Sequence, residues 1–220
     1  MYICLESDDS FDDDLENIPY LKFMPYIGYD YFSSTPKTLI LGHSRYWEEN
    51  DVNKDDIRDY FDSTYGYAIK DNGTATNKLR AFRNTVAMIT GKGYHYSDNE
   101  WKNMAYHVFF QGIVGKNSRD KSLITNKLIE QSQKAYIDVI KILQPQLIIA
   151  WGIDDLYKEY VPQSNREIID KENIVYKYTD FPDTIIWHIL HPSGVYGFPL
   201  EDYQKRYLFI INKYFDQSKE

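Results

Sequence analysis

The stretch Thr38-Leu39-Ile40-Leu41-Gly42-His43-Ser44-Arg45-Tyr46-Trp47 decides how the rest of the chain is interpreted. A short run of apolar residues ends at a glycine, and polar and aromatic residues follow it at once. This pattern predicts a buried strand that runs into a loop at one edge of a sheet. Functional side chains are expected in such a loop, because open α/β sheets bind ligands beyond the carboxyl ends of their strands.

A second stretch, far along the chain, has the same organisation. The run Thr184-Ile185-Ile186-Trp187-His188-Ile189-Leu190 is followed directly by His191-Pro192-Ser193-Gly194. If the two strands lie parallel in one sheet, both polar groups emerge at the same edge. We therefore expect a single site that combines residues from both stretches.

Helical and strand patterns alternate around these two stretches. The sequence predicts helices at 51–70, 76–90, 121–143, 154–160 and 200–214, and further strands at 104–110, 146–152 and 173–178. Short, continuously apolar strands that alternate with helices are typical of a parallel sheet covered on both faces. We expect one α/β domain over residues 18–220, preceded by an acidic N-terminal segment, residues 1–17.

Composition limits the classes of protein to consider. The 220-residue chain has one cysteine, Cys4, so it can form neither an internal disulfide nor a cysteine-based zinc site. Its apolar runs are far shorter than the roughly 20 residues that a membrane span needs. We expect a cytoplasmic monomer with no cofactor, no metal and no membrane contact.

The net charge of −8 is concentrated at one end of the chain. Seven of the 33 acidic residues lie in residues 1–16, which leaves 26 acidic against 25 basic residues in the remainder. A nearly neutral body leaves nucleic acid open as a partner. The local cations Lys116, Arg119 and Lys121 are candidates for contacts with a phosphate backbone, although a solvated helix start explains them equally well.

With these residues in place, the chain resembles the uracil-DNA glycosylase superfamily. Its last motif, commonly His-Pro-Ser, corresponds to His191-Pro192-Ser193-Gly194, and residues 141–152 are similar to its helix-proline-strand-glycine signature. Its first motif, Gly-Gln-Asp-Pro-Tyr-His in the best-known branch, is replaced by Gly42-His43-Ser44-Arg45-Tyr46. A divergent branch with Gly-Glu-Ser-His-Tyr is closer, and Pro25-Tyr26-Ile27-Gly28 matches the lead-in of that branch.

The resemblance implies a three-layer α/β/α sandwich around a four-stranded parallel sheet. It also implies hydrolysis of the base–sugar N-glycosidic bond in DNA, single-stranded DNA included. His191 would donate a hydrogen bond to the base oxygen that gains charge, and Ser193 and Gly194 would hold a phosphate. Ser44 stands where the water-activating Asp of the superfamily would be, and His43 or Glu48 is the candidate to replace that Asp.

The base itself would lie near Gly42. Tyr46 is a candidate to stack on the base or to block it. Asn103 is a candidate to read a base edge, because a side-chain amide offers both a donor and an acceptor. A turn or cap role for Asn103 is the simpler alternative.

Three other interpretations stay open. A serine cannot act as a general base as an Asp does, so the scaffold could bind nucleic acid or a nucleotide without turnover. Gly42-His43-Ser44 also resembles a serine nucleophile elbow with His191 as the base, although Tyr46 replaces the closing glycine of that motif. Metal binding by His188 and His191 is disfavoured, because residues three apart on a strand point to opposite faces.

Overall fold

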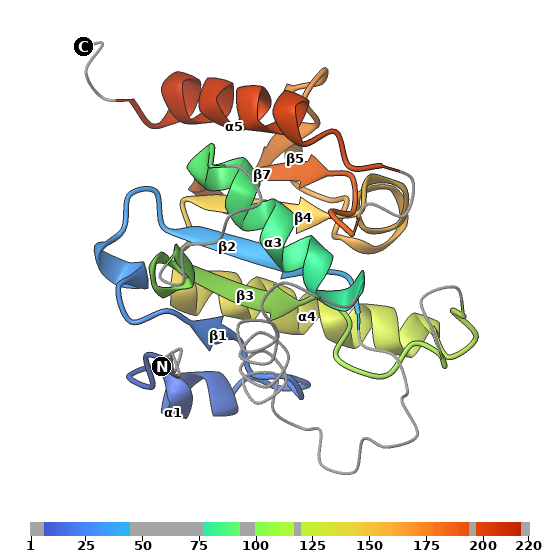
Figure 1. Ribbon diagram of the computed structural model, residues 1–220. Helices are drawn as coiled ribbons and strands as arrows, with labels where there is room; N and C mark the ends of the chain where they lie inside the picture. Colours follow the sequence, from blue (N-terminus) through green and yellow to red (C-terminus); the bar gives the residue numbers. More distant parts are fainter. Residues whose placement is uncertain (1–6, 45–76, 93–99, 117–119, 194–196, 217–220) are drawn as a thin grey trace.

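The computed structural model describes residues 7–44, 77–92, 100–116, 120–193 and 197–216. The predicted helix at 51–70 lies outside the described residues, and so do Arg45, Tyr46, Arg119 and Gly194. The described chain forms one sheet with helices on both of its faces (Figure 1). The predicted α/β class is confirmed.

The sheet has seven strands in the order β1-β3-β2-β4-β7-β6-β5. The strands are β1 Tyr26–Ile27, β2 Thr38–Gly42, β3 Met104–Val108, β4 Leu147–Trp151, β5 Arg166–Asp170, β6 Val175–Tyr178 and β7 Phe181–Ile189. The adjacent strands β3, β2, β4 and β7 are parallel, whereas β1, β6 and β5 pair antiparallel with their neighbours.

The prediction of a sheet of four parallel strands is therefore wrong for the sheet as a whole. Strands β5, β6 and β7 follow one another through short turns, and strands joined by so few residues can only pair antiparallel. β5 was missed because its sequence, Arg-Glu-Ile-Ile-Asp, carries charges at both ends and has no continuous apolar run.

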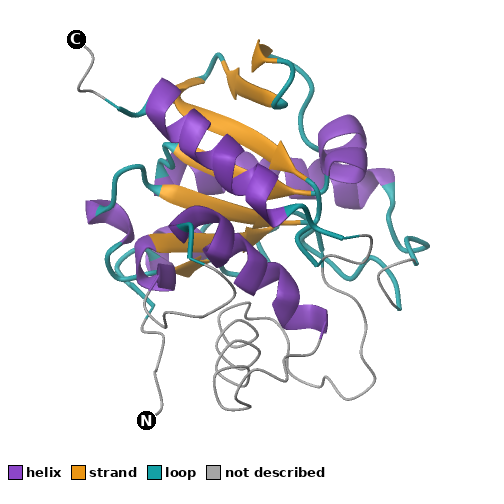
Figure 2. Ribbon diagram, turned by 45° about the horizontal axis from the view of Figure 1, so that its top comes forward, coloured by secondary structure: helices purple, strands orange, loops and turns teal. Residues whose placement is uncertain are grey.

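Helices α3 (Asn77–Thr90) and α5 (Leu200–Tyr214) cover one face of the sheet, and α4 (Asn126–Leu143) covers the other (Figures 1 and 2). The short α1 (Asp12–Glu16) and the π-helix η3 (Ile153–Tyr160) lie on the α4 side. None of the described helices is both long and apolar enough to cross a membrane.

A capping side chain sets the start of helix α4, and a left-handed residue followed by proline sets its end. The Thr125 hydroxyl accepts a hydrogen bond from the Leu128 N–H at 3.1 Å and so caps the first turn. Gln144 adopts a left-handed conformation (φ 45°) immediately before Pro145, which cannot continue the helix. The helix thus starts five residues later than the predicted 121.

The sheet divides the core into two parts, because successive side chains of a strand point to opposite faces. Ile40, Ile149 and Trp187 pack toward α3 and α5. Ile148 and Ile186 pack toward α4. Burial on both faces explains why the parallel strands are continuously apolar in sequence.

The N-terminal segment is less separate than the sequence suggested. The Asp8 N–H donates to the Ile27 carbonyl at 2.7 Å, and Leu15 of α1 is fully buried on the α4 side. Residues 7–17 therefore pack against the rest of the described chain. The acidic side chains of Asp13 and Asp14 remain exposed in the first turn of α1.

Gly42 ends β2 directly against the side chain of Tyr106. A Cβ at residue 42 would lie 2.5 Å from the Tyr106 Oη and 3.1 Å from its Cζ. The Tyr106 ring has little room to retreat, because it packs against Phe82 at 5.1 Å and Trp151 at 5.6 Å between ring centroids. Glycine at this position is thus a steric requirement.

We predict that Gly42→Ala lowers the free energy of unfolding by about 1–3 kcal/mol, the usual cost of overpacking. Removing the phenolic oxygen should relieve part of the clash, so the same substitution should cost less in a Tyr106→Phe background. Urea denaturation of the four proteins of this double-mutant cycle measures both terms. Equal costs in the two backgrounds would contradict the steric explanation.

Candidate functional site

The four parallel strands end together at one edge of the sheet. Gly42 pairs with Val108 of β3, and Trp151 of β4 pairs with Ile189 of β7. In Figure 1 this carboxyl edge is where the arrowheads of β2, β3 and β4 point. The two sequence motifs, at His43 and at His191, therefore emerge at the same edge, as predicted.

The β2 half of the site consists of His43 and Ser44. The carbonyl groups of Gly42 and His43 accept hydrogen bonds from the N–H groups of Phe109 and Phe110, at 2.9 and 3.1 Å. The His43 ring is half-buried and lies 5.2 Å from the Phe110 ring. Its Nδ1 forms a hydrogen bond of 2.6 Å with the Ser44 hydroxyl.

The β7 half is a turn that is bound to both helices of one layer. The Leu190 N–H donates to the Tyr203 Oη of α5 at 3.1 Å. The Asn84 Nδ2 of α3 donates to the Pro192 carbonyl at 2.6 Å. The His191 ring packs nearly perpendicular to the Trp151 indole, with 5.6 Å between ring centroids.

The protonation of His191 follows from its contacts. The Ser193 N–H donates to His191 Nδ1 at 3.2 Å, so Nδ1 is an acceptor and the proton of the neutral ring is on Nε2. Although the side chain is exposed at the surface, loss of solvation by the surrounding protein lowers the pKa of His191 to about 4. Even a smaller shift in this direction leaves the ring neutral at pH 7, with Nε2–H as its donor.

The two halves lie on opposite faces of the sheet edge. His43 contacts Phe110 and Tyr160 of the α4-side core, whereas His191 contacts Trp151 of the α3/α5-side core. Hence a ligand that touches both must lie across the end of β4. β2 and β7 are the two neighbours of β4, so their ends are roughly 10 Å apart.

Gly152 leaves that space open. It follows β4, lies between the two halves and has a positive φ of 101°. Among the described residues, a Cβ at this position would meet no heavy atom within 4 Å. No described side chain therefore covers the backbone at the centre of the edge.

Asn103 does not join the site. It ends the short helix η2 (Glu100–Asn103) immediately before β3, which places it at the amino edge of the sheet, opposite the two motifs. The structure therefore does not bring Asn103 together with His43 and His191, and its predicted role in reading a base edge stays a prediction. The reason is topological: a residue that precedes a parallel strand lies at the edge where no other motif emerges.

The predicted phosphate contacts change as well. The backbone N–H of Ser193 already donates to His191, so among its polar groups only the half-buried hydroxyl remains for a phosphate. Lys116 and Lys121 are exposed, and the Lys116 N–H donates a hydrogen bond to the Asp120 carboxylate.

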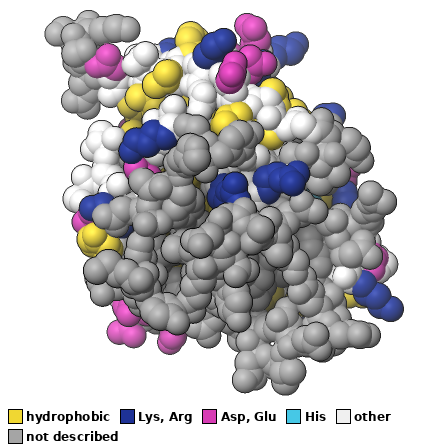
Figure 3. Space-filling model, viewed as in Figure 1, with side chains coloured by type: hydrophobic (Ala, Val, Ile, Leu, Met, Phe, Trp, Pro, Cys, Tyr) yellow, Lys and Arg dark blue, Asp and Glu magenta, His cyan; other side chains and the backbone are white. Residues whose placement is uncertain are grey.

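The surface over α5, at the top of Figure 3, carries basic and acidic side chains side by side.

A second polar group lies beneath η3 and was missed by sequence reasoning. His188 is 1% exposed, and its Nε2 forms a hydrogen bond of 3.1 Å with the Tyr176 hydroxyl. The Arg166 guanidinium lies 4.4 Å from the centre of the Tyr157 ring and 4.8 Å from that of Tyr176. No local pattern signals this group, because β5 and β6 bring its members together.

η3 connects this group with the β2 half. The Val161 N–H bonds the Leu156 carbonyl five residues earlier, at 2.9 Å, which is the spacing of a π-helix. Its Tyr157 ring lies 5.2 Å from His188, and its Tyr160 ring lies 5.9 Å from His43. Hydrogen bonding of this i→i+5 type is rare in proteins.

Metal binding receives no support from the described residues. His188 is enclosed on the α4 side, whereas His191 lies against Trp151 on the other side. Within the described ranges, no three His, Cys, Asp or Glu side chains are placed to hold a metal ion.

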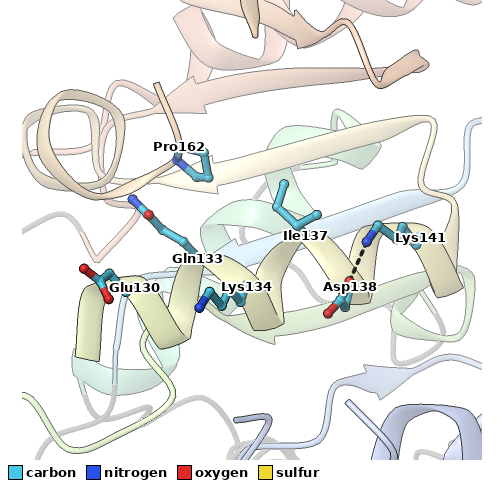
Figure 4. A pocket seen from close by; sticks show the side chains of 7 residues that line it. All are labelled: Glu130, Gln133, Lys134, Ile137, Asp138, Lys141 and Pro162. Carbon is cyan, nitrogen blue, oxygen red and sulfur yellow. Dashed lines mark hydrogen bonds and ion pairs between the residues drawn. The ribbon is translucent and has the colours of Figure 1, made fainter. Parts of the chain in front are cut away.

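A shallow depression of about 390 Å³ lies on the outer surface of α4 (Figure 4). It is lined by Glu130, Gln133, Lys134, Ile137, Asp138, Lys141 and Pro162. Lys141 is neutralised by Asp138 at 2.6 Å, and Gln133 is held by the Tyr160 carbonyl at 2.7 Å. The depression shares no lining residue with the carboxyl edge and does not belong to the candidate site.

A scan against protein-family models found no match for the chain, and a search of curated proteins found no significant relative.

We predict that His188 makes stability depend on pH. Burial, and secondarily the Arg166 charge, lowers the pKa of His188 to about 3, whereas an unfolded chain titrates near 6.5. The unfolded state alone takes up the proton between these values, so this contribution is complete above pH 6.5 and is lost as the pH falls toward 3. From pH 7.5 to 5 the loss is about 2 kcal/mol.

Urea denaturation at several pH values measures this slope. In His188→Gln, the loss of stability that His188 causes at low pH should disappear. Burial also lowers the pKa of His107 to about 3, so the corresponding loss from His107 should remain. An unchanged slope in the variant would exclude His188 as its source.

Proposed function

We propose that the protein binds a nucleotide unit of DNA across the end of β4 and hydrolyses its base–sugar N-glycosidic bond. The observation that carries the proposal is His191, a neutral ring at the carboxyl edge whose Nε2–H is the donor. The four adjacent parallel strands, with helices on both faces, are compatible with the fold that the resemblance to uracil-DNA glycosylases implies. The motif His191-Pro192-Ser193-Gly194 adds support from sequence.

The chemistry requires a donor of this kind. Water attacks C1′ of the sugar, the C1′–N bond breaks, and its electron pair moves onto the departing base. The base anion carries much of this charge on an exocyclic carbonyl oxygen, which accepts a hydrogen bond from Nε2–H. A preorganised donor aimed at developing negative charge is worth about 2.7–4 kcal/mol in the transition state.

The dimensions of the edge support the same substrate class. A nucleoside is about as long as the roughly 10 Å between the ends of β2 and β7. The base would lie at His191 and the sugar above Gly152, where no side chain of the described residues lies. The water would then lie at the β2 half, beside His43 and Ser44.

The β2 half is also the reason for a second candidate function. Ser44 has no carboxylate, and its hydroxyl is paired with His43 Nδ1 at 2.6 Å. In the proposed reaction, the Ser44 hydroxyl accepts the proton of the water and passes its own proton to His43 Nδ1, the atom with which it is paired. If this pair does not activate water, the same edge serves as a nucleic-acid or nucleotide binding module without turnover.

The proposal includes single-stranded DNA as a partner, because an unpaired base is the least costly to turn out of a stack. We also propose that the protein acts as a monomer in the cytoplasm. The cytoplasmic location is favoured by the single cysteine, because disulfides are rare in that compartment.

We predict that the wild-type protein generates abasic sites in oligonucleotides that contain uracil, hypoxanthine or xanthine. His191→Ala should lower the cleavage rate constant by about 10²–10³, the effect of removing one oxyanion donor. Cleavage of single- and double-stranded substrates at pH 7.5 measures this. His188→Gln is the matched control, because this histidine lies near the end of β7, three residues before His191, but faces the opposite core.

Cleavage that is unaffected by His191→Ala would overturn the mechanism. Salt-sensitive DNA binding without cleavage by the wild type would favour the binding module instead.

We predict that Ser44→Asp raises cleavage by about tenfold or more, because a positioned carboxylate is a stronger general base than a hydroxyl. Ser44→Ala should have a smaller, negative effect. If Ser44 were instead the nucleophile of a serine hydrolase, Ser44→Asp would abolish activity and a fluorophosphonate probe would label the wild type at Ser44. Specific labelling would therefore contradict the glycosylase proposal.

A further inference from the structure

The peptide unit between Pro192 and Ser193 is held at both of its polar atoms. Its carbonyl oxygen accepts a hydrogen bond from Asn84 Nδ2 at 2.6 Å, and its N–H donates to His191 Nδ1 at 3.2 Å. The carbonyl and the N–H of one peptide unit lie in a single plane. Whatever fixes the direction of this carbonyl therefore also fixes the direction of the N–H that faces the His191 ring.

In the turn His191-Pro192-Ser193, the ψ angle of Pro192 is the backbone rotation that the proline itself does not fix. The ring of Pro192 sets its own φ, and it confines the preceding His191 to extended conformations. The ψ angle of Pro192 then decides where the Ser193 N–H points. Asn84 is the side chain that holds this angle, since it binds the Pro192 carbonyl directly.

Asn84 is well placed for this role. It lies on α3 and is 2% exposed. The orientation of its amide is determined by its partner: a carbonyl oxygen can only accept, so the nitrogen of Asn84 must face it. The hydrogen bonds on either side of the peptide run in the same direction and polarise one another.

We propose that Asn84 is a positioning residue that selects the tautomer of His191. Through the Pro192–Ser193 peptide it holds an N–H donor against Nδ1, which leaves the ring proton on Nε2. The consequence for catalysis rests on the proposed function, because Nε2–H is the donor to the departing base. The tautomer itself is a property of the unliganded protein and can be measured without any activity.

The other contacts of the turn do not select the tautomer. Tyr203 accepts from the Leu190 N–H and so fixes the end of β7, one residue before the ring. Trp151 supports the ring plane through a ring contact and does not reach Nδ1 through a hydrogen bond in the described structure. Among the described residues, the hydrogen bonds that reach Nδ1 run from Asn84 through the Pro192–Ser193 peptide.

Nuclear magnetic resonance of the unaltered, ¹⁵N-labelled full chain provides the first test. At pH 7.5 we expect the His191 ring to be in the Nε2–H form, with a nitrogen–nitrogen coupling across the hydrogen bond between the Ser193 amide and Nδ1. A ring that carries its proton on Nδ1, or the absence of this coupling, would overturn the proposal.

Two matched variants provide the second test. Asn84→Leu keeps the approximate size of the side chain but removes the donor. Gln204→Leu removes a comparable hydrogen bond, from Gln204 Nε2 to the Ala87 carbonyl at 2.9 Å, between α5 and the same helix α3. The ratio of Nε2–H to Nδ1–H should fall by about fivefold in Asn84→Leu, the factor that one ordinary hydrogen bond supplies, and should not change in Gln204→Leu.

An unchanged tautomer ratio in Asn84→Leu, or an equal change in both variants, would overturn the proposal. If Asn84→Leu does not fold, the coupling in the wild type still decides. A wild type that cleaves no substrate but shows the expected ring signals would remove the proposed function and leave the role of Asn84 in place.

Discussion

The parallel pairing of β4 with β2 on one side and β7 on the other is the constraint on which this structure depends. Because these strands are paired residue by residue, the chain must leave the sheet at the same level after Gly42, Trp151 and Ile189. Strands with helices on both faces have no solvent-exposed face on which to place polar chemistry. The carboxyl edge is the remaining place, and both histidine motifs lie there.

The same constraint explains what the sequence could and could not predict. Buried strands with continuous apolar runs, such as β2 and β4, are visible in sequence because burial selects their residue types directly. β5 cannot be recognised in the sequence, because it is an edge strand and its residues are partly exposed. Its strand conformation depends on hydrogen bonding to β6, which the sequence of β5 alone does not reveal. Asn103 is a different case, because the strand predicted at 104–110 already places it at the start of a strand and hence at the amino edge of a parallel sheet.

The candidate site divides in a similar way. His191 could be found from its motif because a proline and small residues after a strand are a local pattern. Asn84 could not, because its role arises from a contact across 108 residues of chain. The physical signal is a buried amide that binds a backbone carbonyl in a turn, and only the fold reveals it.

Three histidines illustrate how position, rather than residue type, decides chemistry. His107 and His188 are enclosed on all sides, and burial lowers the pKa of each to about 3, so each is a neutral part of the core. His191 is also kept neutral, but its ring is exposed and one nitrogen is already occupied by the Ser193 N–H. A neutral ring with one occupied nitrogen has a single free polar atom, and this atom is a donor. The exposed His191 ring can therefore donate a hydrogen bond to a ligand in one direction. A charged or freely rotating ring would not fix that direction.

The two halves of the edge are built by different cores, so a ligand that contacts both would bridge them through the backbone of Gly152.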